Sequence, residues 1–138
     1  MRHSRNMSQK LTLEDIRDNI VIIKINKSFR EGMSKTELYD VTRGCWKRKI
    51  ASVEKADYAL AVAYGIVKEV YQINEWLPAE DEVRETIPYN EALDAGRIIF
   101  KGRTADEIIR KKYLDYSVAE LFKKGEASPI KVIMKPQR

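Results

Sequence analysis

The chain has 138 residues, 43% of them hydrophobic and 34% charged, and its net charge at pH 7 is +5. This length fits one domain, and this composition excludes a fully disordered chain. No stretch approaches the roughly 18 apolar residues of a membrane-spanning helix, so we expect no membrane partner.

The supply of metal ligands and nucleophiles is small. The sequence holds one histidine, His3, in a polar N-terminal stretch, and one cysteine, Cys45. A structural zinc site needs about four cysteine or histidine ligands, and a catalytic triad needs a positioned imidazole. We therefore expect no metal and no other cofactor, and a binding role rather than catalysis. A single cysteine and a polar N-terminus also indicate a cytoplasmic protein.

The N-terminal part begins with a polar stretch. Residues 1–11 predict a flexible tail, and residues 12–138 predict a single globular domain. Thr12 and Asp15 have helix-capping spacing and predict a short helix. The apolar run 19–26, NIVIIKIN, is too short for a buried helix and predicts a central strand.

A helix and a strand are expected next. Ser34 and Glu37 form a capping-box pattern, which predicts a helix that ends near Arg43, before Gly44. Residues 46–50 predict a short strand.

Two longer strands follow, over residues 58–64 and 66–76, with a tight turn or bulge at Gly65. Residues 77–96 predict a long excursion with a short helix over 89–95, and loops of this length are uncommon unless functional. Charge is concentrated here, because residues 69–94 hold eight acids and one base, a net −7, which leaves +12 on the rest of the chain.

The C-terminal part predicts a strand over 97–102 and a final strand over 130–135. Two further capping boxes predict helices that start at Thr104 and Ser117. This order favours an α+β fold: a small, mixed, barrel-like sheet with helices packed outside. A parallel doubly wound sheet does not fit, because strands and helices do not alternate between residues 46 and 76.

The densest candidate site is the run from Arg43 to Lys49, RGCWKRK. Arg43, at a helix end, is placed either to pair with a buried carboxylate or to meet a ligand. Trp46 either stacks on a nucleic-acid base beside these cations or fills the core. Trp76 ends the longest strand and forms either a pocket wall or a core plug.

The nucleic-acid hypothesis assigns a role to each candidate. Phosphate contacts are predicted for Arg43, Lys47 and Arg48, and stacking for Trp46, Tyr64 and Trp76. Either Lys68 or Glu69, neighbours on the central strand, is expected to face the pocket.

Two alternatives remain. The acidic segment 69–94 would serve a protein-interaction module, such as a phage factor that acts on a host protein. A metal-dependent nuclease would use acids for its metal, but no lysine follows an acid at a spacing of two, as restriction-type nucleases commonly require. The acids concerned are Glu69, Asp81, Glu82, Asp106 and Glu107.

Several segments between residues 19 and 134 resemble an uncharacterised family of bacterial and phage modules. They are NIVIIKIN, LYDVTRGCW, GIVKEVYQINEW and KKYLDYSV, with FKKG and PIK beyond. Such modules occur alone or joined to nuclease domains, including the GIY-YIG type. Their strand order is similar to that of the PUA-like barrels (the EVE, ASCH and YTH group), which grip a nucleotide base, often a modified one, in an aromatic pocket.

The resemblance implies a PUA-like fold and a nucleic-acid-binding module. Its partner would be DNA or RNA, with a modified or flipped base held in an aromatic pocket. The setting would be phage–host conflict or restriction, in the cytoplasm of a bacterium or of a phage-infected host cell. No pocket residue is carried over by motif.

Overall fold

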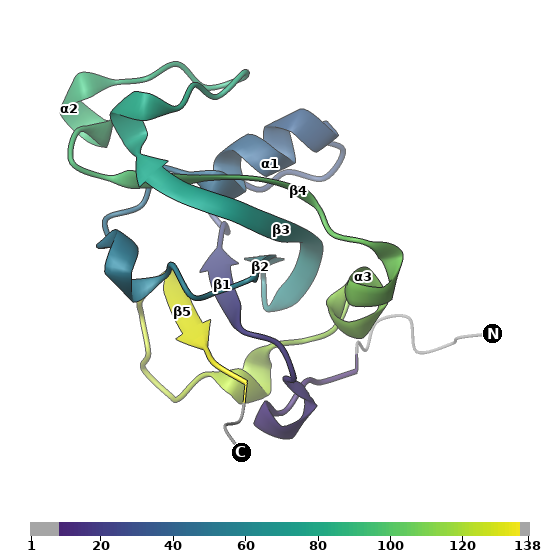
Figure 1. Ribbon diagram of the computed structural model, residues 1–138. Helices are drawn as coiled ribbons and strands as arrows, with labels where there is room; N and C mark the ends of the chain where they lie inside the picture. Colours follow the sequence, from purple (N-terminus) through teal and green to yellow (C-terminus); the bar gives the residue numbers. More distant parts are fainter. Residues whose placement is uncertain (1–8, 136–138) are drawn as a thin grey trace.

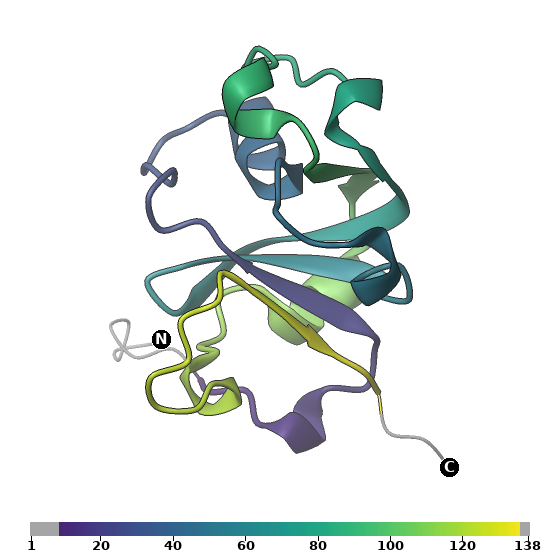
Figure 2. The same cartoon turned by 90° about the vertical axis from the view of Figure 1, so that its left-hand side faces the viewer.

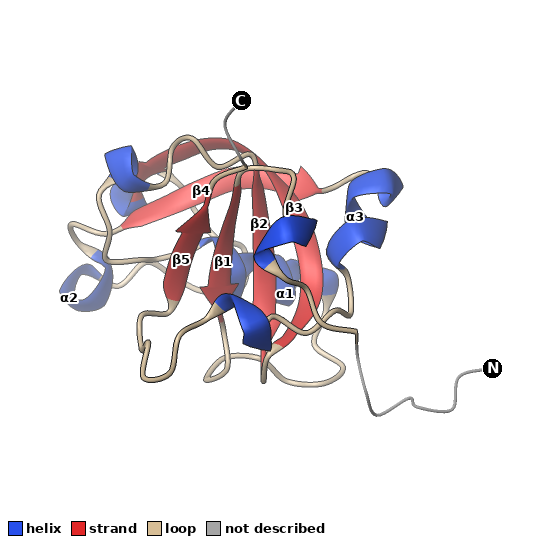
Figure 3. Ribbon diagram, turned by 90° about the horizontal axis from the view of Figure 1, so that it is seen from below, coloured by secondary structure: helices blue, strands red, loops and turns tan. Residues whose placement is uncertain are grey.

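The computed structural model describes residues 9–135 and is built on one five-stranded sheet with the order β4-β3-β2-β1-β5 (Figure 1). The parallel pair β1 and β2 lies in the middle, and all other neighbours are antiparallel (Figure 3). The strands are β1 (Ile20–Lys24), β2 (Tyr58–Ala63), β3 (Ile66–Pro78), β4 (Ile98–Thr104) and β5 (Ile130–Ile133), and the α-helices are α1 (Lys35–Arg43), α2 (Glu91–Asp94) and α3 (Glu107–Tyr113).

The predicted α+β class with a small mixed sheet is confirmed. The first and last strands, β1 and β5, pair with each other. The sheet is nevertheless open, because β4 and β5 form its two edges, so "barrel-like" describes its curvature rather than a closed ladder.

Two layers cover the sheet (Figure 2). One face carries α1 and the segment 79–96, which we call the acidic lobe; the other carries α3 and two single-turn helices, Leu13–Asp15 and Ala119–Leu121. Because both faces are covered, β1 is apolar throughout rather than alternating. Its residues Ile20 to Ile23 are all fully buried.

Local sequence patterns account for several of the elements. Ser34 and Glu37 form the predicted capping box, and α1 ends at Arg43 as expected. Tyr64 and Gly65 make the turn between β2 and β3, and both have positive φ, at 52° and 81°. That combination is the twist-matched turn of a tight hairpin, so the predicted interruption at Gly65 is confirmed. The short helix expected over 89–95 is also present, as α2.

Two predicted elements differ from the structure. Residues 46–50 form no strand: Trp46 makes a single bridge to Ile98, after which the chain turns into a short helix at Ile50–Ser52. Thr104 does not open a helix, because it is the last residue of β4. The N–H of Ala105 donates to a carbonyl of β3 and holds the chain against the sheet, so α3 starts later.

The flexible tail predicted for residues 1–11 extends too far, because residue 11 already belongs to the folded domain. Leu11 is 2% exposed, within the core, and its N–H donates to the carbonyl of Ser117. His3 lies outside the described residues. No helix within residues 9–135 has the length and apolar character needed to cross a bilayer.

Candidate functional site

Arg43 is buried and fastens the acidic lobe to α1. Its side chain is 4% exposed; Nη1 donates to Glu82 Oε2 at 2.7 Å and Nε to Asp40 Oδ1 at 3.2 Å. Nη2 donates to the carbonyl of Val83, and the guanidinium lies 4.5 Å from the ring centre of Tyr39. Burial, the largest single influence, acts to lower the pKa of Arg43, but Glu82, Tyr39 and Asp40 together outweigh it and the pKa is raised. The guanidinium therefore stays charged and fully occupied by protein.

A second set of contacts holds the lobe in place. The backbone N–H and the hydroxyl of Thr86 both donate to Asp40 Oδ2, each at 2.8 Å. Arg84 donates to the carbonyl of Gly44 and pairs with Asp94, and the side chains of Arg84 and Asp94 are mostly buried.

Of the two roles predicted for Arg43, the structure shows the pairing with a carboxylate. This corrects the phosphate contact predicted for it, because no side of the guanidinium is open.

A cavity of about 540 Å³ lies beyond the carboxyl end of β1, and we call it the cationic cavity. Lys24, Lys27, Arg97 and Trp46 contribute to its wall, together with Asn26 and the segment 127–129; no carboxylate does. Within residues 9–135, none of these three cations has a carboxylate within salt-bridge distance. Such a cavity has a positive potential that attracts anions.

Backbone pairing fixes Trp46 in this wall. Trp46 and Ile98 exchange two backbone hydrogen bonds of 2.9 Å, which places Trp46 beside Arg97. The indole Nε1 donates to the carbonyl of Thr42 at 2.8 Å, so the ring is held at one edge and half-buried. Arg48 donates to the carbonyl of Ile130, next to the cavity wall. Of the predicted site, Trp46 therefore lines this cavity, Arg48 is bound at Ile130, the residue after the wall residue Pro129, and Lys47 is exposed between them.

A second cavity, of about 230 Å³, shares Lys24 and Asn26 with the first. We call it the apolar pocket, because its other walls are Val62, Gly65, Val118, Ala119 and Phe122. Tyr64 stands beside it: its N–H donates to Asn26 Oδ1 at 2.8 Å, and its side chain is largely solvent-exposed.

Trp76 and Lys68 lie elsewhere. Trp76 is 8% exposed and packs edge-on against Phe100 at 5.3 Å between ring centres, so it is the core plug rather than a stacking surface. Its Nε1 has no hydrogen-bond partner among the described residues. The ammonium of Lys68 lies 5.1 Å from the ring centre of Phe29. The structure thus groups Trp46, Arg48 and Tyr64 near the end of β1 and separates Arg43 and Trp76 from them.

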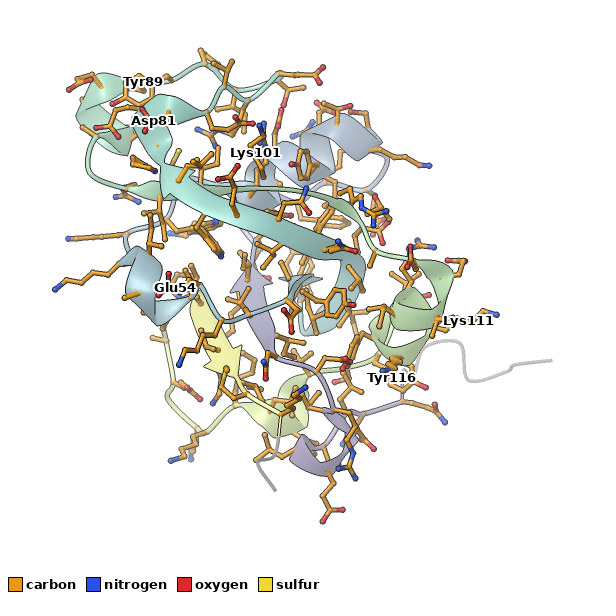
Figure 4. All side chains as sticks on the ribbon, in the orientation of Figure 1. Glu54, Asp81, Tyr89, Lys101, Lys111 and Tyr116 are labelled. Carbon is orange, nitrogen blue, oxygen red and sulfur yellow. The ribbon has the colours of Figure 1, made fainter. Side chains whose placement is uncertain are left out.

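The acids of the nuclease alternative are dispersed. Glu69 accepts from Arg110 at 2.8 Å, and Glu107 accepts from the same guanidinium at 2.6 Å. Glu82 pairs with Arg43, whereas Asp81 lies on the outer side of the acidic lobe with Tyr89 (Figure 4). Over residues 9–135, no three Asp, Glu, Cys or His side chains come close enough to hold a metal ion. Burial raises the pKa of the Cys45 thiol.

Sequence reasoning did not assign Lys24, Asn26, Lys27, Arg97 or Phe122 to the site, although all five line these cavities. Lys24, Asn26 and Lys27 close the apolar run of β1, and Phe122 follows the last single-turn helix. The sequence pattern could have indicated Lys24, Asn26 and Lys27, because polar side chains that follow a buried strand lie together at the end of that strand. Phe122 carries no such signal, since the fold alone brings it beneath Lys24, whose ammonium lies 3.9 Å from its ring centre.

Comparisons of the chain with protein-family models, curated proteins and solved structures find no match. The family resemblance of the sequence segments therefore stays a prediction.

Proposed function

We propose that this protein is a nucleic-acid-binding module whose cationic cavity takes backbone phosphates beside a base stacked on Trp46. The supporting observation is the convergence of Lys24, Lys27 and Arg97 on a cavity without carboxylates. Phosphate contacts by lysine and arginine supply most of the affinity in such complexes. An aromatic ring at the same place adds a stacking platform that tolerates any base.

The pairing of cations elsewhere sharpens this argument. Arg30, Arg43, Arg84, Arg110 and Lys131 each have a carboxylate partner within 4.0 Å. Other described cations, such as Lys49 and Lys101, also have no carboxylate partner, but the cavity cations line one concave site together, which is the arrangement that a polyanion requires.

The test is the double variant Lys27→Gln, Arg97→Gln, measured by fluorescence anisotropy with labelled single-stranded DNA and RNA over a series of salt concentrations. We expect weaker binding and a salt slope reduced by roughly 0.7 per lost phosphate contact. The matched control is Lys101→Gln, Lys111→Gln, on β4 and α3 away from the cavity, where both lysines are exposed and Lys111 points outward (Figure 4). Equal affinities for wild type and the cavity variant would contradict the proposal, and equal losses in both variants would reduce it to non-specific charge attraction.

A second candidate function is a protein-interaction module, favoured by the exposed apolar side chains of the acidic lobe. Val83 is 81% exposed, Leu93 65% and Tyr89 42%, on a segment that buried ion pairs hold in place. Apolar groups ringed by exposed acids suit a basic, partly apolar protein surface. Retention of a protein partner after nuclease treatment, and its loss in Val83→Ser, Leu93→Ser, would support this candidate.

A further inference from the structure

The apolar pocket adjoins the cationic cavity at the carboxyl ends of the parallel strands. β1 ends at Lys24 and β2 at Ala63, and Lys24 and Asn26 belong to the walls of both cavities. An anion in the cationic cavity and an apolar group in the pocket would therefore lie on either side of Asn26. A nucleotide has this division, with a charged phosphate joined through the sugar to a planar base whose faces are apolar and whose edges are polar.

The size and lining of the pocket suit one planar ring. Its volume of about 230 Å³ lies below the roughly 300 Å³ at which sites for drug-sized molecules begin. Val62, Val118 and Phe122 provide apolar wall, and Phe122 already carries the ammonium of Lys24 over its face at 3.9 Å. This composition, apolar with a few fixed polar groups, is typical of ligand sites.

Asn26 supplies an oriented donor at the mouth of the pocket. Its Oδ1 accepts a hydrogen bond from the backbone N–H of Tyr64 at 2.8 Å. This bond identifies the oxygen of the side-chain amide and so also places its nitrogen. Its Nδ2 donates no hydrogen bond to any described residue, so the amide N–H groups are available to an acceptor on a ligand. Base edges carry such acceptors at ring nitrogens and carbonyl oxygens.

We infer that the apolar pocket takes one unstacked nucleobase of the strand whose phosphates lie in the cationic cavity. This inference rests on the proposed function and names its ligand class: single-stranded or locally unpaired nucleic acid rather than intact duplex. A base within a duplex is stacked on both faces and cannot enter a pocket unless it is turned out of the helix.

Three exposed alanines provide matched blocking variants. Ala119→Phe fills the apolar pocket, Ala127→Phe fills the cationic cavity, and Ala92→Phe on α2 fills neither. The probes are a labelled single-stranded DNA, the same strand with abasic sites in place of its bases, and the corresponding duplex. Thermal unfolding of each variant checks the fold, and Ala119→Leu serves as a smaller block.

We expect wild type to bind the intact strand more tightly than the abasic strand or the duplex. Ala119→Phe should lower affinity for the intact strand by about tenfold and leave the abasic strand and the salt slope unchanged, because only base contacts are lost. Ala127→Phe should weaken all three probes, and Ala92→Phe none.

The two proposals fail in different ways. If wild type binds neither strand, the proposed function is overturned. If wild type binds, Ala127→Phe weakens binding and both Ala119 variants bind the intact strand as tightly as wild type, the base pocket is overturned while the function stands. Equal affinity of wild type for intact and abasic strands would overturn both the base pocket and the stacking on Trp46, and only the phosphate contacts of the proposed function would stand.

Discussion

The acidic lobe and the cationic cavity differ in whether their cations are paired with carboxylates. At the lobe, the buried cations Arg43 of α1 and Arg84 of the lobe itself each meet a carboxylate, so the charges stabilise the fold. At the cavity, Lys24, Lys27 and Arg97 line a concave surface with no carboxylate. Pairing with a carboxylate, rather than place in a basic run, therefore distinguishes the cations that stabilise the fold from those that we propose as phosphate ligands.

The basic run RGCWKRK is divided between these two regions. Arg43 closes α1 and pairs with the lobe, whereas Trp46 lines the cavity and Arg48 binds the carbonyl of Ile130, next to the wall residue Pro129. The backbone leaves the helix at Gly44, where a β-carbon would lie 2.8 Å from the side chain of Ile99. Glycine is needed at this position because the chain passes so close to β4.

The largest effect is expected for Arg43→Leu. Leucine preserves apolar volume but leaves Asp40 and Glu82 without their cation, and breaking a buried ion pair costs roughly 3–5 kcal/mol. Urea unfolding followed by circular dichroism should show a loss of this size in the free energy of unfolding. Arg103→Leu is the control, because Arg103 is 59% exposed and its pair with Asp106 spans 4.0 Å. Similar losses in both variants would contradict a structural role for the Arg43 network.

Thr86→Val should have the next largest effect, within the same network. It removes the hydroxyl donor to Asp40 and keeps the backbone donor to the same oxygen. A hydrogen bond to a charged group contributes roughly 1.5–3 kcal/mol. Hydrogen exchange should accelerate across residues 79–96 and stay unchanged in β1, and Thr86→Ser should behave like wild type. Acceleration spread evenly over the sheet would show that the lobe is not a separate unit.

Glu126→Gln tests the carboxylate nearest to the cavity segment 127–129. The backbone N–H of Lys123, and then Lys131, hold the pKa of Glu126 below its usual value. A lowered folded-state pKa stabilises the protein above the unfolded-state pKa of about 4.3, and that stabilisation is lost as the pH falls through the folded-state value. The melting temperature of wild type should therefore exceed that of Glu126→Gln slightly at pH 7, and the difference should vanish in acid. A difference independent of pH would contradict this origin.

The smallest effect on stability is expected for Lys27→Gln, Arg97→Gln. Neither cation has a carboxylate partner among the described residues, so the free energy of unfolding should stay within about 0.5 kcal/mol of wild type. Chemical denaturation measures this value on the same samples used for binding. A loss above about 1 kcal/mol would place these cations with the structural group and remove the contrast between the two regions.

Much of the architecture could be predicted from neighbouring residues. The uninterrupted apolar run of β1, the Ser34–Glu37 capping box and the turn at Gly65 each encode a local conformation, and all three are present. The strand expected over 46–50 is absent, because Trp46 forms only a single bridge, to Ile98, and the chain then turns into the short helix Ile50–Ser52. Local propensity could not anticipate that distant partner.

By itself the sequence determined the α+β class, the order of the central elements and the concentration of acids in one segment, because these depend on periodicity and composition along the chain. Only the tertiary structure decided which charges are paired. Arg43 meets Glu82 39 positions away, and Arg97, the residue before β4, lines the same cavity as Lys24 at the end of β1. Burial and ion pairing depend on distances in space, and the fold sets these distances when it places the end of β1, the residue before β4 and the segment before β5 around one cavity.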